Sequence, residues 1–423
     1  MQQPARLAAI DSLGPLFRDR ARALDEAESF PYENFKELAQ AGLLNLTLAE
    51  KWGGQGLWSG DRYVAYYEVL ERLAIYDSST AQLLQVHSHA VGILSLLATE
   101  QQAARYLIPI AASGQLVASV GSESRPAAAG SGIYESELAP LPGGGWTLTC
   151  EKHFASLGPG ADWLMIWVAV PRDGDGDYAD RTVVLLVPRD APEVELIDEW
   201  DVMGMRSTVS WGVKITGYEV PADAVFGEPG DWRHRDPRTF TLGFTANHVG
   251  AAQAALDFGT QWVRARPHLS RSELVQLMLG ELAASVFAAR SALYAAARLW
   301  ETADGDAAEL ASLKALHIAK QTALAVTQRV FEVCGSRSAF RLFPLEQMYR
   351  DVRTFTLHFR DEEYSRDIGA ALVTESFQAK RRIAGSKLHT FPRCYTISTF
   401  DFGPCRGLMR LLDMLLQQIL LDM

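Results

Sequence analysis

The stretch RTFTLHFRDEEY (353–364) places one histidine between apolar side chains and a run of acids. His358 follows Leu357 and precedes Phe359, and carboxylates occupy positions 361–363. An imidazole exchanges protons or forms hydrogen bonds near neutral pH, so a histidine in apolar surroundings is a candidate for acid–base or positioning chemistry. The same pattern is more often that of a core histidine beside a solvated, charged helix end. Taken alone, the stretch favours the structural interpretation.

Other polar residues are candidates for the same kind of chemistry. His87 and His89 lie in STAQLLQVHSHAVGILSLLA (79–98), and Ser156 lies in HFASLGPGADW (153–163). Because the two histidines are two residues apart, they point to different faces of a helix. The sequence has no Walker loop, no GxGxxG after a strand, no GxSxG elbow and no HExxH motif. No metal site is predicted, and each histidine taken singly is more often structural than catalytic.

Three segments with different residue patterns would position these residues. Residues 1–115 and 236–375 carry apolar residues at helical spacing, whereas residues 116–235 contain short β-branched and aromatic runs separated by glycine, proline and aspartate. We therefore expect an α+β protein with an N-terminal helical domain, a middle β-barrel domain and a C-terminal four-helix bundle. Residues 376–423 form a tail to which the sequence assigns no function.

Apolar stripes predict the bundle. The first stripe consists of Leu274, Met278, Leu282, Val286, Ala289, Leu293, Ala297 and Trp300. The second consists of Leu316, Ala319, Ala323, Val326, Val330 and Val333. Alanine-rich faces allow two long helices to pack closely and antiparallel. The segment 79–98 is apolar nearly all round, which predicts a buried helix.

Composition argues against several functional classes. The net charge is −11, and the only compact basic run is KRR at 380–382, so a nucleic-acid-binding protein is not expected. The apolar run at 408–423 is interrupted by charged and amide residues and is too short to span a membrane. The cysteines form no C-x-x-C pair, which predicts neither a zinc site nor a disulfide framework; they are Cys150, Cys334, Cys394 and Cys405. The start of the chain does not resemble a signal peptide, and we expect a cytoplasmic protein.

Longer motifs connect these segments to a known family. FPYENFKELAQAGLLNLTLAEKWGGQGL (30–57), SVGSESRPAAAGSG (119–132), GGGWTLTCEKHFASLGPGADWLMIWV (143–168) and EWDVMGMRSTVSWGVKITGYEVPADAVFG (199–227) occur in this order. Together they resemble the acyl-CoA dehydrogenase superfamily over about residues 20–370. The resemblance implies a flavin, FMN or FAD, between the β-domain and the bundle, and a neighbouring subunit that completes the site in a homodimer or homotetramer.

The resemblance also implies roles for single residues. Ser122 would bond the flavin ring, Phe154 would stack near it and Ser156 would lie near its N5 atom. The remaining implied contacts are Ser131 at the flavin phosphate, Arg266 at the cofactor of a neighbouring subunit, Gln276 and Gly335 at further cofactor-contact positions in the bundle, and Arg206 at the substrate. Hydroxyl groups, an apolar wall and positive charge are what a flavin needs from its protein.

The region around His358 separates two branches of the superfamily. Alignment on Arg350–Asp351 puts Phe359 where a dehydrogenase has the glutamate that removes the substrate's α-proton, and phenylalanine cannot accept a proton. Glu273 or Glu281 remains a candidate for a relocated base. VFEVCGSRSAFRLFPLEQMYRDVRTFTLH (330–358) instead resembles the flavin-dependent monooxygenase branch that includes dibenzothiophene monooxygenases. That branch implies catalytic roles for His358, for Ser156 and for His87 or His89.

The predicted function is therefore a two-component flavin monooxygenase. It would take reduced flavin from a separate reductase and use O2, through a C4a-hydroperoxyflavin, to oxidise a small organic substrate. One alternative is an FAD-dependent acyl-CoA dehydrogenase with a relocated or missing base. Another is a flavoprotein scaffold without turnover.

Overall fold

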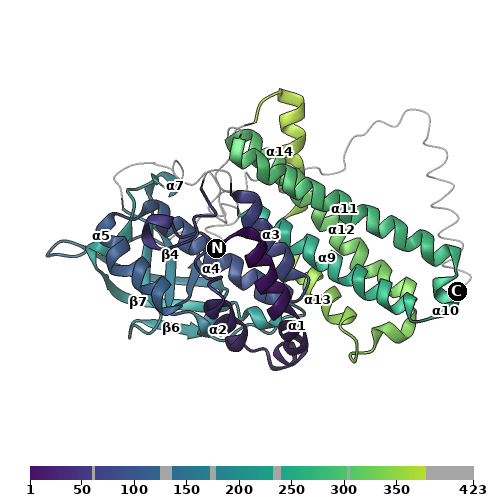
Figure 1. The fold of residues 1–423 in the computed structure, drawn as a ribbon. Helices are drawn as coiled ribbons and strands as arrows, with labels where there is room; N and C mark the ends of the chain where they lie inside the picture. The colour runs from purple at the N-terminus through teal and green to yellow at the C-terminus, as the bar shows by residue number, and fades with distance from the viewer. Residues whose placement is uncertain (60–61, 124–135, 172–177, 232–239, 303–304, 378–423) are drawn as a thin grey trace, which may run out of the picture.

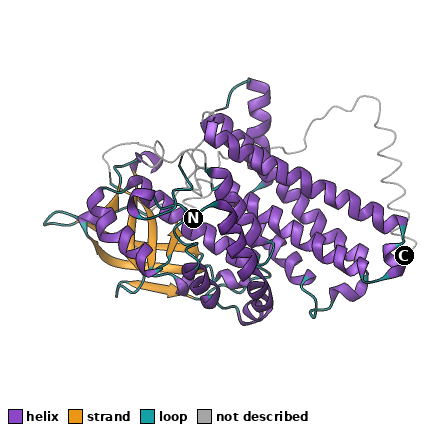
Figure 2. Ribbon diagram, in the orientation of Figure 1, coloured by secondary structure: helices purple, strands orange, loops and turns teal. Residues whose placement is uncertain are grey.

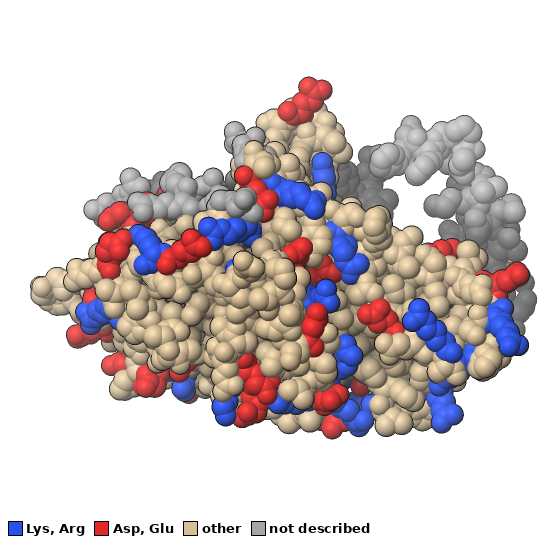
Figure 3. All heavy atoms as spheres, in the orientation of Figure 1, with Lys and Arg blue, Asp and Glu red and all other residues tan. Residues whose placement is uncertain are grey.

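The computed structural model describes residues 1–59, 62–123, 136–171, 178–231, 240–302 and 305–377. In these ranges the chain passes from helices to strands and back to helices (Figures 1 and 2). The strands lie toward one end of the molecule and the long C-terminal helices toward the other (Figure 2). The predicted α+β class is confirmed. On the face drawn in Figure 3, acidic and basic side chains are interspersed without a broad basic area.

The N-terminal part is helical. Its helices are α1 (Gln3–Ala27), α2 (Tyr32–Gln40), α3 (Tyr63–Ala74), α4 (Ser78–Leu97), α5 (Glu100–Gln102) and α6 (Ile108–Ser113). Asp77 starts α4, because its carboxylate accepts hydrogen bonds from the backbone N–H groups of Ser79 and Thr80. Most of α4 is buried, as its apolar surface predicts.

The middle part contains two separate four-stranded sheets. Its elements are β1 (Val117–Val120), β2 (Ala139–Pro140), β3 (Trp146–Ala155), β4 (Trp163–Ala169), α7 (Tyr178–Arg181), β5 (Thr182–Pro188), β6 (Val194–Ile197), β7 (Trp211–Val220) and β8 (Val225–Phe226). The strand orders are β1-β4-β5-β8 and β2-β3-β7-β6. β1 and β4 are parallel, and the other pairs are antiparallel. Among the described strands no ladder joins the sheets into a closed barrel, so the expected barrel is replaced by two sheets.

The pairing of β3 with β7 is irregular where β3 ends. The register shifts between Lys152 and Ala155, and Phe154 inside this bulge has φ +57°. A bulge bends its strand and re-aims the side chain that it carries. The backbone therefore turns the end of β3 away from the regular sheet at the residues for which the sequence predicts flavin contacts.

The C-terminal part is the bundle. Its helices are α9 (Thr241–Arg264), α10 (Pro267–Ser270), α11 (Glu273–Thr302), α12 (Gly305–Cys334), α13 (Leu345–Phe355) and α14 (Asp361–Thr374). The long helices α9, α11 and α12 pack on one another, and the shorter α13 lies against α9 and α12. The predicted stripe of α12 is buried throughout, and that of α11 is buried from Leu282 to Ala297. Leu274 is 65% exposed, whereas the next residue, Val275, packs against the core of the bundle.

By length and composition alone, α11 is apolar enough to cross a membrane. Its inner face, from Leu282 to Ala297, packs in the core of the bundle. Its outer face carries exposed Leu277 and Phe287. The helix is therefore amphipathic in its packing, which is also typical of a helix that joins another protein surface.

Candidate active site

Aromatic rings from α9, α13 and the adjoining turns form one aromatic cluster, which consists of Phe240, Phe244, Phe355, His358 and Phe359. The His358 ring stacks on Phe244 with centroids 4.2 Å apart and planes at 22°. Phe244 stacks in turn on Phe355 at 4.6 Å and 13°. Phe240 and Phe359 meet Phe244 edge-on, each with its centroid 5.0 Å away. Ring contacts therefore hold His358 in the cluster.

The His358 imidazole has a crowded side and an open side. Phe244 packs on the ring, yet the residue as a whole is exposed. Desolvation by the surrounding protein atoms lowers the pKa of His358 to about 4. The ring is therefore neutral at pH 7, whereas the sequence favoured an imidazole that changes charge near that pH. A neutral imidazole still offers one N–H donor and one nitrogen acceptor.

Only one of the two α4 histidines reaches the aromatic cluster. The His89 ring lies 4.5 Å from the Phe240 ring, centroid to centroid. The His87 ring is buried, and its Nδ1 accepts a hydrogen bond of 3.0 Å from the Val117 N–H. That bond leaves the proton on Nε2, which lies 3.1 Å from the Leu44 carbonyl and donates to it. Both nitrogens of His87 thus serve the backbone, so its geometry favours a structural role.

Hydroxyl groups form a chain at the other side of the site. Ser156 Oγ lies 2.8 Å from Ser210 Oγ, and Ser210 Oγ lies 2.9 Å from Thr208 Oγ1. Thr208 Oγ1 donates to the Met205 carbonyl at 2.8 Å. This hydroxyl chain orients Ser156, because each hydroxyl has a defined neighbour.

Met205 links the hydroxyl chain to the aromatic cluster. Its N–H donates to Asp351 Oδ1 of α13 at 2.5 Å. Its side chain belongs to a buried apolar group with Phe244 and Phe355. Burial raises the pKa of Asp351 to about 7, although the hydrogen bond from Met205 opposes the shift. Asp351 therefore fastens the loop of the hydroxyl chain to the helix that precedes His358.

The residues at the ends of β1 and β3 fit a flavin ring. The Ser122 carbonyl accepts a hydrogen bond of 2.8 Å from the His153 N–H, which brings the two strand ends together. Phe154 is 63% exposed and adopts a left-handed backbone conformation that is uncommon for a bulky residue. An exposed flat ring two residues before Ser156, on a strand end that is hydrogen-bonded to Ser122, offers the apolar wall and polar edge that a flavin requires. Ser131, the predicted phosphate contact, lies outside the described residues.

The other predicted cofactor contacts lie at the far end of the bundle. Arg266 stacks over Trp262, with its guanidinium carbon 3.6 Å from the ring centroid. Gln276 Nε2 donates to the Ser270 carbonyl at 2.8 Å, and Gly335 follows α12 with φ +78°. Figure 1 shows α10, beside Arg266, and the labelled strands at opposite ends of the molecule. One chain therefore does not bring this group to Ser122, Phe154 and Ser156.

Arg206, the predicted substrate contact, is held by the end of α1. Its Nε donates to the Asp25 carbonyl at 3.0 Å, and its guanidinium pairs with Glu28. It also donates to the Val202 carbonyl at 2.9 Å. The guanidinium thus joins the 202–206 loop to α1, and this geometry favours a tethering role.

The carboxylates considered as relocated bases do not adjoin His358. Glu281 is on the surface of α11 and pairs with Arg329 at 2.7 Å, while Glu273 is exposed in the first turn of that helix. Close to His358, Asp361 is bound by Lys320 and by the Tyr364 hydroxyl. Partial burial would raise the pKa of Asp361, but these two hydrogen bonds outweigh it and lower the pKa. Asp361 is thus a poor proton acceptor.

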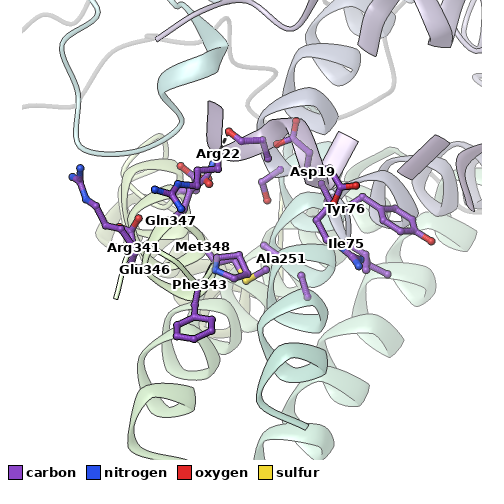
Figure 4. Close-up of a pocket in the computed structure, with 18 of the residues that line it drawn as sticks. Asp19, Arg22, Ile75, Tyr76, Ala251, Arg341, Phe343, Glu346, Gln347 and Met348 are labelled. Carbon is purple, nitrogen blue, oxygen red and sulfur yellow. Dashed lines mark hydrogen bonds between the residues drawn. The ribbon is translucent and has the colours of Figure 1, made fainter. Parts of the chain in front are cut away.

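A separate cavity lies between α1, the junction of α3 with α4, α9 and the start of α13 (Figure 4). Its volume is about 330 Å³. Figure 4 shows Tyr76 and Asp19 on one side and Arg341 and Glu346 on the other. Asp351 is on the cavity wall, but no member of the aromatic cluster lines it. The cavity therefore does not coincide with the site around His358.

Several residues at the site were missed by sequence reasoning. They are Phe240, Phe244, Ser210, Lys320 and the side chain of Asp351. A lysine next to the apolar stripe of α12 was a visible signal, because an unneeded charge is rarely buried there. The ring stack carried no comparable signal, since its members come from distant parts of the chain.

Comparison with known proteins identifies the family of the chain. The model of the acyl-CoA dehydrogenase N-terminal domain matches residues 12–114, and that of the C-terminal domain matches residues 242–362. A dibenzothiophene monooxygenase of Mycolicibacterium goodii is 28% identical over 368 residues, which cover 79% of this chain and 85% of that protein.

Solved structures give the same result for the fold. FMN-bound TdsC from Paenibacillus sp. A11-2 superposes with a TM-score of 0.80 at 25% identity, covering 88% of this chain and 98% of TdsC. A complex of TdsC with FMN and indole gives 0.79 at 25% identity, with the same coverage. Butyryl-CoA dehydrogenase from Megasphaera elsdenii gives 0.79 at 21% identity, again with 88% and 98% coverage, which shows a shared fold. With both of its domain models matched in order, the chain belongs to the acyl-CoA dehydrogenase family.

Proposed function

We propose that this flavin-dependent oxidoreductase is a monooxygenase that acts on a small planar aromatic compound. In the overall reaction, reduced flavin and O2 would give oxidised flavin, water and a substrate that has gained one oxygen atom. The main support for this proposal is the residue at the position of the dehydrogenase base. Phe359 occupies that position, and His358 beside it stacks in the aromatic cluster. Proton abstraction by a glutamate has no counterpart there, whereas oxygen transfer does not require one.

The chain's own residues would hold the flavin at its β-domain end. The exposed Phe154 ring would cover one face, and Ser122 and Ser156 would bond the polar edge. When bound, reduced FMN or FAD supplies the electrons that activate O2. We further propose that a second copy of the chain contributes Arg266, Gln276 and Gly335, because α10, the start of α11 and the end of α12 lie at the opposite end of the molecule.

His358 would act through hydrogen bonding. Because its ring is neutral at pH 7, it can donate from one nitrogen and accept at the other without changing charge. His89, across Phe240, would contribute a second imidazole to the same region. The apolar rings around them would exclude water, which protects a reactive oxygen species from loss to solvent.

The ring geometry and the relatives suggest the substrate class. The rings of Phe355, Phe244 and His358 stack nearly parallel. A flat substrate ring could continue such a stack more readily than a non-planar group. TdsC has been crystallised with indole, a planar heteroaromatic compound. A separate reductase would supply reduced flavin, since the sequence lacks the GxGxxG motif of dinucleotide-binding enzymes.

The test supplies chemically reduced FMN, indole and 18O2 to the purified protein. We expect a product that carries one 18O atom, and His358→Ala should lower product per flavin oxidised about tenfold or more. Reduced-flavin affinity should change less than twofold. Leu357→Ala, which truncates the exposed neighbour, is the matched control and should retain activity.

Four results would argue against the proposal. Unlabelled product would exclude oxygen transfer from O2, and equal activity of His358→Ala and wild type would remove His358 from the reaction. Anaerobic bleaching of bound FAD by butyryl-CoA would instead favour a dehydrogenase. Failure of any flavin to bind in a titration would favour a scaffold without turnover.

A further inference from the structure

The turn that carries His358 is short and lies outside regular structure. α13 ends at Phe355 and α14 begins at Asp361, so residues 356–360 connect two helices. The N–H groups of Leu357 and His358 make only turn-type hydrogen bonds, of 3.1 Å to Thr354 and 3.3 Å to Phe355. Such a segment is expected to move unless other elements hold it.

Lys320 of the neighbouring helix α12 binds this turn. The residue is 5% exposed, and its Nζ donates to the Phe359 carbonyl at 2.8 Å. The same ammonium pairs with the Asp361 carboxylate, so it bonds on both sides of Arg360. Tyr364 Oη donates to Asp361 Oδ1 at 2.6 Å and completes the group. One buried cation thus fixes the end of the turn and the start of α14.

Core packing alone does not account for a lysine at this position. Lys320 adjoins the buried stripe of α12, where Leu316, Ala319 and Ala323 pack as apolar side chains. An apolar residue avoids the desolvation of a charge, and replacing a buried ion pair by apolar groups is often neutral or stabilising. The ammonium adds a defined geometry, because it binds the Phe359 carbonyl and the Asp361 carboxylate.

We propose that Lys320 is a positioning residue that keeps the His358 ring in the aromatic cluster. Holding the Phe359 carbonyl orients the peptide that follows Phe359 and keeps the Phe359 ring edge-on to Phe244. His358, the residue before Phe359, then stays stacked on Phe244, with the two ring centroids 4.2 Å apart. The positioning of the turn by Lys320 does not depend on the proposed function, whereas its effect on turnover through His358 does.

The first experiment measures the turn directly and needs no turnover. Hydrogen exchange of full-length wild type, Lys320→Met and Lys320→Arg is followed in peptides that cover residues 353–361. Lys320→Met keeps most of the side-chain volume and removes the donor, so exchange there should accelerate about tenfold, as expected for a lost charged hydrogen bond. Exchange in α9 and α11 should stay unchanged, and Lys320→Arg should restore part of the protection.

A surface pair on the same helix provides the control. Arg329 of α12 pairs with Glu281 at 2.7 Å, outside the turn. Arg329→Met should leave exchange in 353–361 at the wild-type rate. Equal protection of the turn in Lys320→Met and wild type would overturn the proposal, and so would acceleration spread evenly over the bundle.

The second experiment asks whether Lys320 acts through His358. Product per flavin oxidised is compared in wild type, Lys320→Met, His358→Ala and the double variant. We expect Lys320→Met to lower this ratio about threefold or more while the Kd for reduced flavin changes less than twofold. The double variant should match His358→Ala, because the effects are not additive when one residue acts through the other.

The outcomes distinguish the two proposals. If the two losses multiply in the double variant, Lys320 acts independently of His358 and the positioning inference is wrong. If wild type forms no product, the proposed function fails, but the exchange measurement still decides whether Lys320 holds the turn.

Discussion

His358 combines a low pKa with direct access to solvent. Its crowded side lowers the pKa to about 4, while its ordinary value lies near 6.5. An imidazole with such a low pKa is charged only in acid, so its hydrogen-bonding pattern stays constant across neutral pH. The functional use of His358 should therefore be insensitive to pH where most histidines titrate.

This gives a prediction for the pH dependence of product formation. Between pH 6 and pH 8, the His358-dependent part of the rate should be flat, and it should fall only as the pH approaches 4 and the ring becomes cationic. The measurement compares wild type with His358→Ala at each pH, which removes contributions shared by both. A transition centred near pH 6.5 that is present only in wild type would contradict the low pKa.

Asp351 allows a second prediction, on stability. Its pKa is raised from 3.8 to about 7 by burial, so the folded protein holds its proton more tightly than the unfolded chain. The resulting stabilisation is complete below about pH 4 and is lost as the pH rises through 7. Asp351→Asn keeps an acceptor for the Met205 N–H but does not titrate. Relative to wild type, this variant should gain as much as ~4 kcal/mol of unfolding free energy between pH 4 and pH 7.

Urea unfolding of both proteins at several pH values measures that gain. A free-energy difference that does not vary with pH would mean that Asp351 titrates alike in the folded and unfolded states.

Sequence motifs located individual residues better than they located contacts. Arg350–Asp351 identified the turn with His358, because the motif has a fixed distance to that turn. The choice between His87 and His89 depended on the Val117 N–H and the Leu44 carbonyl, which are far away in the chain. No local pattern encodes such partners, so the sequence left both histidines open.

At the level of elements, periodicity predicted the helices well. The α12 stripe is buried as expected, since a period of 3.6 residues defines one face whatever the partner is. The sheets were harder to predict, because alternation identifies strands but not their neighbours. For that reason the sequence could not distinguish a closed barrel from the two sheets that form.

The start of α4 is a place where one side chain supports an element. Asp77 accepts from the N–H groups of Ser79 and Thr80 at 3.1 and 3.3 Å. Asp77→Ala leaves both donors unpaired and should lower the unfolding free energy by about 1–2 kcal/mol. Asp77→Asn keeps an acceptor, and because burial raises the pKa of Asp77, losing the charge is not costly. Asn should therefore be the milder substitution at pH 7.

Urea unfolding at pH 7 compares the two variants with wild type. Equal losses in Ala and Asn would show that the charge, and not the cap, stabilises α4.

At the scale of the whole molecule, the predicted flavin contacts divide into two groups at opposite ends. The outer face of α11 offers a surface on which a second copy could bring them together, since Leu277 and Phe287 are 60% and 71% exposed there. Exposed apolar side chains on one helix are a feature of surfaces that contact another protein. We therefore expect assembly and flavin binding to depend on the same surface.

Phe287→Glu tests that link. A charge on this face should shift the protein toward smaller species in sedimentation velocity and weaken flavin binding about tenfold or more. Leu16→Glu on α1, 46% exposed, is the control and should leave both unchanged. If Phe287→Glu stays assembled, or dissociates without weakening flavin binding, the second copy does not complete the site through α11.

The contact of Gly204 with α13 has a consequence for how this site can vary. A Cβ at Gly204 would lie 2.2 Å from the Arg350 carbonyl oxygen, so main chain meets main chain at this point. Arg350 also donates to the Met203 carbonyl at 2.8 Å. The loop that leads to Thr208 and Ser210 therefore lies at a fixed distance from α13, because their two backbones are in direct contact. Substitutions among the lining side chains can reshape the space between them, while its width stays the same.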